Sequence, residues 1–127
     1  MLTRRTLLGA LSAIAMLTAT AGGALAQENY DIALISKGFQ HQFWQAVKAG
    51  ADKAAAEFGV TVTFEGPESE SQVDRQMDML AAALSRGPDA IGFAALDSQA
   101  ATPLLQQASD AGIPIIAFDS GVDSDIP

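Results

Sequence analysis

The chain has 127 residues, with 7 Lys and Arg against 15 Asp and Glu, one His and no Cys, which gives a formal net charge of −8. An acidic surface repels a phosphate backbone, so nucleic-acid binding is not expected. The lack of Cys excludes a disulfide framework, a zinc-thiolate site and a cysteine nucleophile.

The first 26 residues have the pattern of a secretory signal peptide. Arg4 and Arg5 precede an uncharged apolar run, Leu7 to Leu17, and small residues follow as far as Ala26. The apolar run is too short to cross a bilayer. The paired arginines also fit a twin-arginine signal. We therefore expect cleavage after Ala26 and a mature chain, residues 27–127, outside the cytoplasm.

The mature chain alternates short β-rich runs with helical patterns, which is typical of repeated βαβ units. It contains no linker or low-complexity segment, so one α/β domain accounts for all of it. The predicted strands are Asp31 to Ile35, Val60 to Phe64, Ala90 to Ala94 and Pro114 to Phe118.

Three helices are predicted between these strands, each from one apolar stripe that can pack on a sheet. A glycine follows each helix, where a left-handed residue closes the last turn. Ser71 with Asp74 resembles a capping box at the start of the second helix. The stripes are Phe43, Val47, Gly50, Ala54 and Phe58, then Val73, Met77, Leu80 and Leu84, then Leu104, Leu105, Ala108 and Ala111; the glycines are Gly59, Gly87 and Gly112.

The predicted fold class is therefore α/β with three layers, a parallel sheet with helices on both faces. If the strand order is 2-1-3-4, the sheet changes direction between the first and third strands, and ligands bind beyond the carboxyl ends there. Three loops then converge on one edge of the sheet: residues 36–44, 96–99 and 119–123. We expect the function to lie in these loops.

The first loop combines aromatic rings with hydrogen-bonding groups, in Gln40, His41, Phe43 and Trp44. A sugar presents a C–H face and a rim of hydroxyls, which such side chains match. Phe43 begins the apolar stripe and could equally pack in the core. Trp44 lies about 100° further around the helix, which favours a position lining a cleft. His41 could donate to a ligand hydroxyl or be solvated.

The other two loops place acids at the same edge. Asp119 follows the fourth strand, where an ionised carboxylate could accept hydrogen bonds from two hydroxyls, and we favour this role over a simple turn before Gly121. Asp97 precedes a helix, so capping is the economical interpretation. Lys37 is either a solvated cation or a donor at the cleft rim. Three acids, Glu65, Glu68 and Glu70, are expected to form a charged surface loop that serves solvation alone.

No motif of an enzyme or of a cofactor site is present. The sequence lacks glycine-rich dinucleotide and triphosphate loops, and it has no nucleophile elbow. A metal site would need more than His41 and scattered carboxylates. We expect a binding protein with no catalytic residue, no metal and no cofactor.

Several stretches occur together, in order, across residues 30–127: Ile32-Ala33-Leu34-Ile35, Phe43-Trp44, Gly50, Pro88-Asp89-Ala90-Ile91, Asp97-Ser98, Ala111-Gly112-Ile113-Pro114-Ile115-Ile116 and Phe118-Asp119-Ser120-Gly121. With their spacing, they resemble the N-terminal lobe of periplasmic sugar-binding proteins. These are the receptors of ABC importers of the ribose- and galactose-binding type, which have the type I periplasmic-binding fold.

The resemblance implies that residues 40–44 hold polar and aromatic sugar contacts, with His41 where the family often has Asn. Asp119 falls on the family's carboxylate that binds sugar hydroxyls, and Ser120 stands where the ribose-type pattern has Arg. These differences point away from ribose and toward another pentose, a hexose or a polyol. The resemblance also implies a periplasmic location, an ABC permease in the membrane as partner, and a monomer when full length.

A member of this family would continue into a second lobe, so residues 27–127 are expected to be a truncated N-terminal lobe. Nothing in residues 123–127 is predicted to end an element or to cap a core.

Other functions fit parts of the same pattern. A phospho-acceptor receiver domain shares the sheet order and would use Asp97, but the first strand ends Ile35-Ser36-Lys37 without the acidic pair that holds Mg²⁺. A lactose-repressor-type effector domain shares the lobe, but an export signal stands where its DNA-binding helices would be. A sugar sensor that signals to a membrane receptor fits as well as a transport receptor does.

Overall fold

The computed structural model describes residues 28–127, so the predicted signal peptide and its cleavage position lie outside the described residues. Each predicted strand is present, with its ends within one residue of the prediction. No helix in the described part of the chain combines the length and the apolar character that a membrane span needs. The elements are β1 (Asp31–Ile35), α1 (Gln42–Phe58), β2 (Thr61–Glu65), α2 (Val73–Arg86), β3 (Ala90–Phe93), α3 (Thr102–Asp110) and β4 (Ile115–Ala117).

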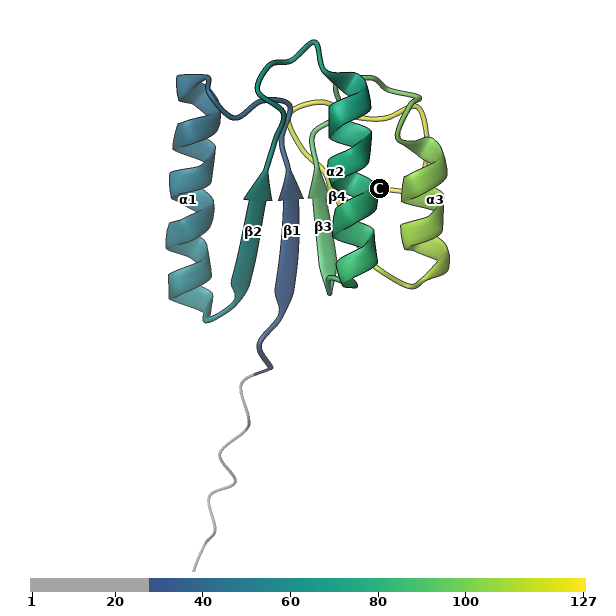
Figure 1. Ribbon diagram of the computed structural model, residues 1–127. Coiled ribbons are helices and arrows are strands. Elements are labelled where there is room, and N and C mark those ends of the chain that lie inside the picture. Colours follow the sequence, from purple (N-terminus) through teal and green to yellow (C-terminus); the bar gives the residue numbers. More distant parts are fainter. Residues whose placement is uncertain (1–27) are drawn as a thin grey trace, which may run out of the picture.

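The four strands form one parallel sheet in the order β2-β1-β3-β4 (Figure 1). β1 is central, and its Ile32 pairs with Val62 of β2 and with Ala90 of β3. This order confirms the predicted topology. All carboxyl ends therefore meet at one edge of the sheet, the upper edge in Figure 1, and the change of direction falls between β1 and β3.

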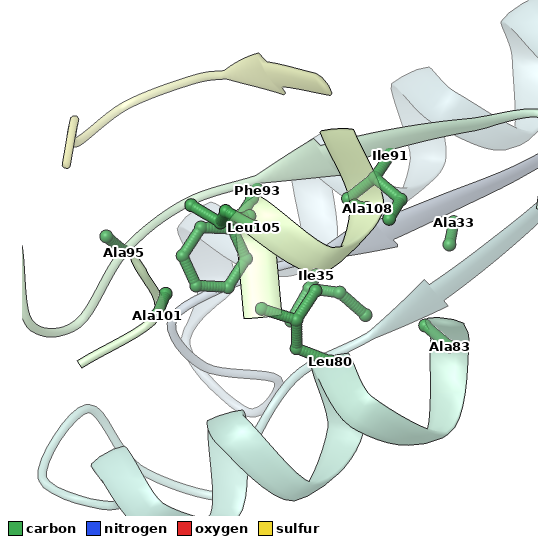
Figure 2. Packing of buried hydrophobic residues seen from close by; sticks show 10 residues of the cluster. All are labelled: Ala33, Ile35, Leu80, Ala83, Ile91, Phe93, Ala95, Ala101, Leu105 and Ala108. Atoms are coloured by element: carbon green, nitrogen blue, oxygen red, sulfur yellow. The ribbon is translucent and has the colours of Figure 1, made fainter. Parts of the chain in front are cut away.

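Alternate residues of the strands face opposite sides of the sheet, as β geometry requires. One side packs against α2 and α3 and contains the main core, where Ile35, Leu80, Phe93 and Leu105 are fully buried (Figure 2). We call this side the packed face. Its buried cluster consists of Ala33, Ile35, Leu80, Ala83, Ile91, Phe93, Ala95, Ala101, Leu105 and Ala108.

On the other side of the sheet lies α1, which contacts β2 at one edge. The rest of this side, over β1, β3 and β4, is open, and Ile116 of β4 is 70% exposed. Helices thus lie on both faces, which confirms the three-layer prediction. Between α1 and the sheet lies an apolar groove of about 480 Å³, lined by Ile32, Leu34, Val47, Gly50, Ala51, Ala54, Ala90, Ile91, Gly92, Ile116 and Phe118.

Two of the three predicted helix ends are confirmed directly. Gly59 and Gly87 close α1 and α2 with left-handed backbones, at φ 66° and 67°. Gly112 is also left-handed, at φ 75°, but it lies one residue beyond the cap of α3, which is Ala111 in a right-handed conformation. Glycine meets this requirement because it has no Cβ to clash.

The predicted capping box of α2 is wrong. The N-cap is Gln72, and its side chain makes no capping bond to the helix. The hydroxyl of Ser71 pairs instead with that of Ser69 at 3.0 Å. Asp74 lies in the first turn, where the positive end of the helix dipole favours an acid. Asp74 therefore marks the start of the helix as predicted, but Ser71 does not cap it.

The last described residues return to the body of the domain. Val122 and Ile126 pack against the core cluster, and the backbone N–H of Asp123 donates to Ser98 O at 2.8 Å. The expectation that residues 123–127 cap nothing is therefore wrong. Two apolar residues separated by three polar ones, in so short a segment, gave no period from which this packing could be predicted.

Candidate functional site

The loops after β1, β3 and β4 meet at the carboxyl edge of the sheet, as predicted. Lys37 in the first loop forms an ion pair with Asp119 in the last, with 2.7 Å between Nζ and Oδ2. The hydroxyl of Ser120 donates to Ala95 O at 2.6 Å and joins the last loop to the end of β3. Three separate segments thus surround one small region. Its floor is the switch point between β1 and β3.

Asp119 has an unusual backbone. Its φ of 61° makes it the one residue other than glycine with a positive φ among residues 28–127. Asp tolerates this left-handed conformation better than most residues, but it still costs free energy, and such strain is concentrated at functional positions. The N–H of Ser120 donates back to Phe118 O at 2.7 Å and closes the bend. A polar hollow of about 230 Å³ lies over residues 117–121.

The sequence left open whether Lys37 is a solvated cation or a donor at the cleft rim. In the structure it lies among the converging loops, paired with Asp119. Its side chain is 22% exposed and that of Asp119 is 30% exposed, so the pair is partly shielded from water. The ammonium also lies 6.0 Å from the centre of the Trp44 ring, where a cation–π attraction is still felt. The pair offers donors and acceptors side by side with no net charge.

Trp44 is buried and Phe43 is exposed, which reverses the burial expected from their helical phase. The indole is 1% exposed and the Phe43 ring 49% exposed. Trp44 is in helical phase with Val47 and Ala51, which line the groove, so the inward stripe of α1 begins at Trp44 and lies one residue away from the predicted phase. Gly38 covers the indole so closely that an added Cβ would lie 3.3 Å from its Cδ1. Whether the rings contact a ligand stays a prediction.

The acids at the end of β2 and in the loop after it do more than solvate the loop, contrary to expectation. Glu70 accepts a hydrogen bond from the indole Nε1 of Trp44 at 3.0 Å, and this bond satisfies a buried donor. Glu65 forms an ion pair with Arg86 at 2.7 Å. The sequence could not reveal either contact, because both join segments that are far apart in the chain.

Gln40 and His41 lie at the start of α1, and both are exposed. His41 is the N-cap of α1, and its Nδ1 accepts a hydrogen bond from the N–H of Phe43 at 3.2 Å. This cap satisfies one of the free donors at the helix start, which the sequence interpretation did not consider. Sugar contacts from Gln40 and His41 stay predictions.

Asp97 is a capping residue, as expected, but it caps the turn before α3. Its Oδ1 accepts hydrogen bonds from the N–H groups of Gln99, at 2.9 Å, and Ala100, at 2.8 Å. These two bonds lower the pKa of the carboxyl group below its ordinary value, and the bond from Gln99 has the larger effect. The N-cap of α3 itself is Ala101, which has no capping side chain.

No metal cluster is formed by the described residues: residues 28–127 contain no group of three His, Cys, Asp or Glu side chains placed to hold an ion. The residues that the loops bring together offer hydrogen bonding, charge pairing and contact with aromatic rings.

The comparison with protein families shows which family this chain belongs to. The family described as "periplasmic binding protein domain" matches residues 32–126. The chain belongs to this family. The match includes all four strands and all three helices, together with the three loops at the carboxyl edge.

Solved structures agree with this assignment. The chain is 44% identical to a Brachyspira murdochii protein named as an ABC transporter and LacI family transcriptional regulator, with a TM-score of 0.69 over 74% of this chain. It is 38% identical to an ABC transporter solute-binding protein from Agrobacterium vitis with bound D-fucose, with a TM-score of 0.71 over 76% of the chain. It is 33% identical to a carbohydrate transporter solute-binding protein from Agrobacterium radiobacter in complex with D-arabinose, with a TM-score of 0.73 over 78%.

These three proteins are much longer than the present chain, which spans 29% of the Brachyspira protein and 33% of each Agrobacterium protein. The shared part contains the parallel sheet and its helices, which confirms the α/β periplasmic-binding fold. Two of the three compared proteins hold a monosaccharide in their structures.

Proposed function

We propose that residues 27–127 form the N-terminal lobe of a periplasmic solute-binding protein that captures a monosaccharide or polyol for an ABC transporter. The observation that supports this most directly is the ion pair of Lys37 with Asp119, 2.7 Å apart at the carboxyl edge of the sheet and beside Trp44. The sugars bound to the D-fucose and D-arabinose proteins support the same class of ligand.

The chemistry of the pair suits an uncharged, hydroxylated ligand. The carboxylate of Asp119 can accept from two neighbouring hydroxyls, and the ammonium of Lys37 can donate to a hydroxyl or ring oxygen. Because the two charges cancel, a cationic or an anionic ligand gains little from the site. Gln40, His41, Phe43 and Ser120 complete the proposed contact set with Trp44. The hydroxyl of Ser120 already donates to Ala95 O, so it would act through its lone pairs.

The proposal includes the location and the partners. Residues 1–26 would be removed as a signal peptide, and a second lobe would close over the sugar by a hinge motion before the closed form docks on the permease. The full-length receptor would be a monomer without a cofactor or enzymatic activity. N-terminal sequencing of protein recovered from the periplasm should give Gln27 as the first residue, and an intact Met1 would contradict export by cleavage.

Two alternatives lose ground on particular residues. A receiver domain would need acids at the end of β1, where Ser36 is instead fully buried and donates to Gly38 O. It would also need a free Asp97, whose Oδ1 is engaged by two backbone N–H groups. A regulator of the lactose-repressor type would bind operator DNA, which the acidic composition disfavours.

Binding can be tested by tryptophan fluorescence, because Trp44 lies beside the proposed ion pair, 6.0 Å from the Lys37 ammonium. The full-length protein should be titrated with pentoses, hexoses and polyols, and its thermal midpoint followed in parallel. We expect one compound, or a small group of related ones, to change the fluorescence and raise the midpoint. A flat response to the whole panel would count against sugar binding.

The assigned pair can be tested with matched variants. Asp119→Asn keeps the shape and tolerates the left-handed backbone, and Lys37→Met keeps most of the side-chain volume. Each should weaken sugar binding by about 10- to 100-fold, the value of one hydrogen bond to a charged group. Lys48→Met and Asp52→Asn are the controls, since they remove an ion pair of similar length, 2.6 Å, on the surface of α1. Equal effects of both pairs would mean that the site is misplaced.

A further inference from the structure

A buried amide lies directly beneath the proposed site. Gln76 of α2 is fully buried, and with Ser36 it is one of two buried polar residues in the described chain. Burying an amide is costly unless its donors and acceptor are all satisfied. Here they are: Nε2 donates to Ser36 O at 2.9 Å and to Ala94 O at 2.8 Å, and Oε1 accepts from the N–H of Leu96 at 3.0 Å.

The partners of this amide are the first residues beyond two strand ends. The pairing of β1 with β3 ends at Ile35 and Phe93, followed by one bond from Ala94 N–H to Ile35 O at 2.9 Å. Beyond that point the two strands lead into different loops. The two N–H bonds of Gln76 therefore connect the diverging chains at the place where the sheet changes direction, which is where ligands bind in open α/β sheets.

The same bonds lead to both members of the ion pair. Ser36, held by Gln76, is followed by Lys37. Ala95 lies between Ala94 and Leu96, which both bond to Gln76. The carbonyl oxygen of Ala95 accepts from the Ser120 hydroxyl at 2.6 Å, and its N–H donates to Ser120 O at 3.4 Å. Ser120 in turn follows Asp119. One side chain thus fixes the backbone on both sides of the pair.

We infer that Gln76 is a positioning residue of the sugar site, which sets the distance between Lys37 and Asp119 without contacting either. This inference rests on the proposed function. A purely structural amide would contribute to folding stability and leave ligand affinity unchanged. A positioning amide affects affinity as well, because contacts to a rigid ligand depend on the separation of the groups that make them.

The variant to compare is Gln76→Met, which keeps an unbranched side chain of similar size and removes the three hydrogen bonds. Affinity should be measured on the full-length protein at a temperature where circular dichroism shows it fully folded. We expect sugar binding to weaken about tenfold, as when one hydrogen bond to a charged group is lost through poor alignment. Gln106→Met is the control, because its amide contacts Asp110 at 2.8 Å on the exposed side of α3. It should bind like wild type.

A double variant separates positioning from simple destabilisation. If Gln76 acts through the pair, Gln76→Met should change affinity less than about twofold once Lys37→Met is present, since coupled residues are not additive. Equal, independent effects in the two backgrounds would overturn the inference. So would a lowered unfolding midpoint with an unchanged dissociation constant.

A measurement on the wild type covers the case in which Gln76→Met does not fold. The side-chain amide resonances of Gln76 should shift in the nuclear magnetic resonance spectrum when sugar saturates the site, and unshifted resonances would overturn the inference. If the wild type binds no sugar, the proposed function fails and the inference fails with it. If the wild type binds and both tests on Gln76 are negative, only the positioning role is wrong.

Discussion

The two faces of the sheet differ sharply in how well they are covered. On the packed face, α2 and α3 bury ten apolar residues in one cluster. On the other face, α1 sits toward β2 and leaves an apolar groove of about 480 Å³ over the remaining strands. Both faces carry apolar strand residues, so the presence of such residues does not say which face is filled. Coverage depends on how many helices the connections place on each side.

The difference predicts where substitutions will be felt. In a closely packed core, a change in side-chain volume lowers the free energy of unfolding, whereas an open groove has room for added atoms. The following substitutions test this contrast, and each can be followed by chemical denaturation of the present chain.

The largest effect is expected from Phe93→Ala. The Phe93 ring is fully buried in the middle of the packed face (Figure 2). Its removal leaves a cavity that neighbouring side chains cannot fill, so the free energy of unfolding should fall by about 3–5 kcal/mol. A loss below about 1 kcal/mol would mean that this face does not hold the core.

A matched pair of insertions should give opposite results. Ala83→Leu adds volume to a fully buried position on the packed face, and we expect a loss of about 1–3 kcal/mol from overpacking. Ala54→Leu adds the same atoms to the lining of the groove, where they leave water, so we expect a gain of up to about 1 kcal/mol. Similar losses at both positions would remove the distinction between the faces.

A smaller effect is expected from Ile116→Ala. This side chain points toward the open face and is 70% exposed, so its removal should change the free energy of unfolding by less than about 0.5 kcal/mol. Its neighbour Ile115 packs against the core cluster. Ile115→Ala is therefore the control, and it should cost clearly more than the change one residue further along the strand.

The smallest effect concerns Asp97, whose turn leads into α3 on the packed face. The pKa of this carboxyl group is lowered in the folded state, so its ionised form stabilises the fold above the unfolded pKa of about 3.9, and this contribution disappears as the pH falls through the folded pKa. Asp97→Asn should lower the urea midpoint slightly at pH 7 and not at pH 2.5.

Much of the fold could be predicted because its signals are local. Strand runs, one-sided helices and glycines such as Gly59 and Gly87 each report on their own neighbourhood, and the right-handed crossover rule then leaves few topologies. Some failures were at positions decided by contacts between distant segments, such as Trp44, whose buried indole donates to Glu70. The first turn of α2 failed for a local reason, because the hydroxyl of Ser71 pairs with that of Ser69 instead of capping the helix.

The site was harder to predict for the same reason. The convergence of the loops follows from topology, but the pairing of Lys37 with Asp119 and the cover over Trp44 depend on side chains that meet only after folding. Gln76 was not singled out from the sequence, because a Gln on a helix is ordinarily exposed. A polar residue in phase with the buried stripe of α2, between Val73 and Leu80, is the one sign that could have drawn attention to it.

The position of β1 has a consequence for how the chain is made. β1 is the first element to be synthesised and the central strand of the sheet, so its second neighbour, β3, comes from a much later part of the chain. Pairing between segments so far apart is slow, because a long loop must close before the contacts form. The side of β1 that pairs with β3 therefore stays open until Ala90 to Phe93 are complete, whereas β2 is available for pairing with the other side much earlier.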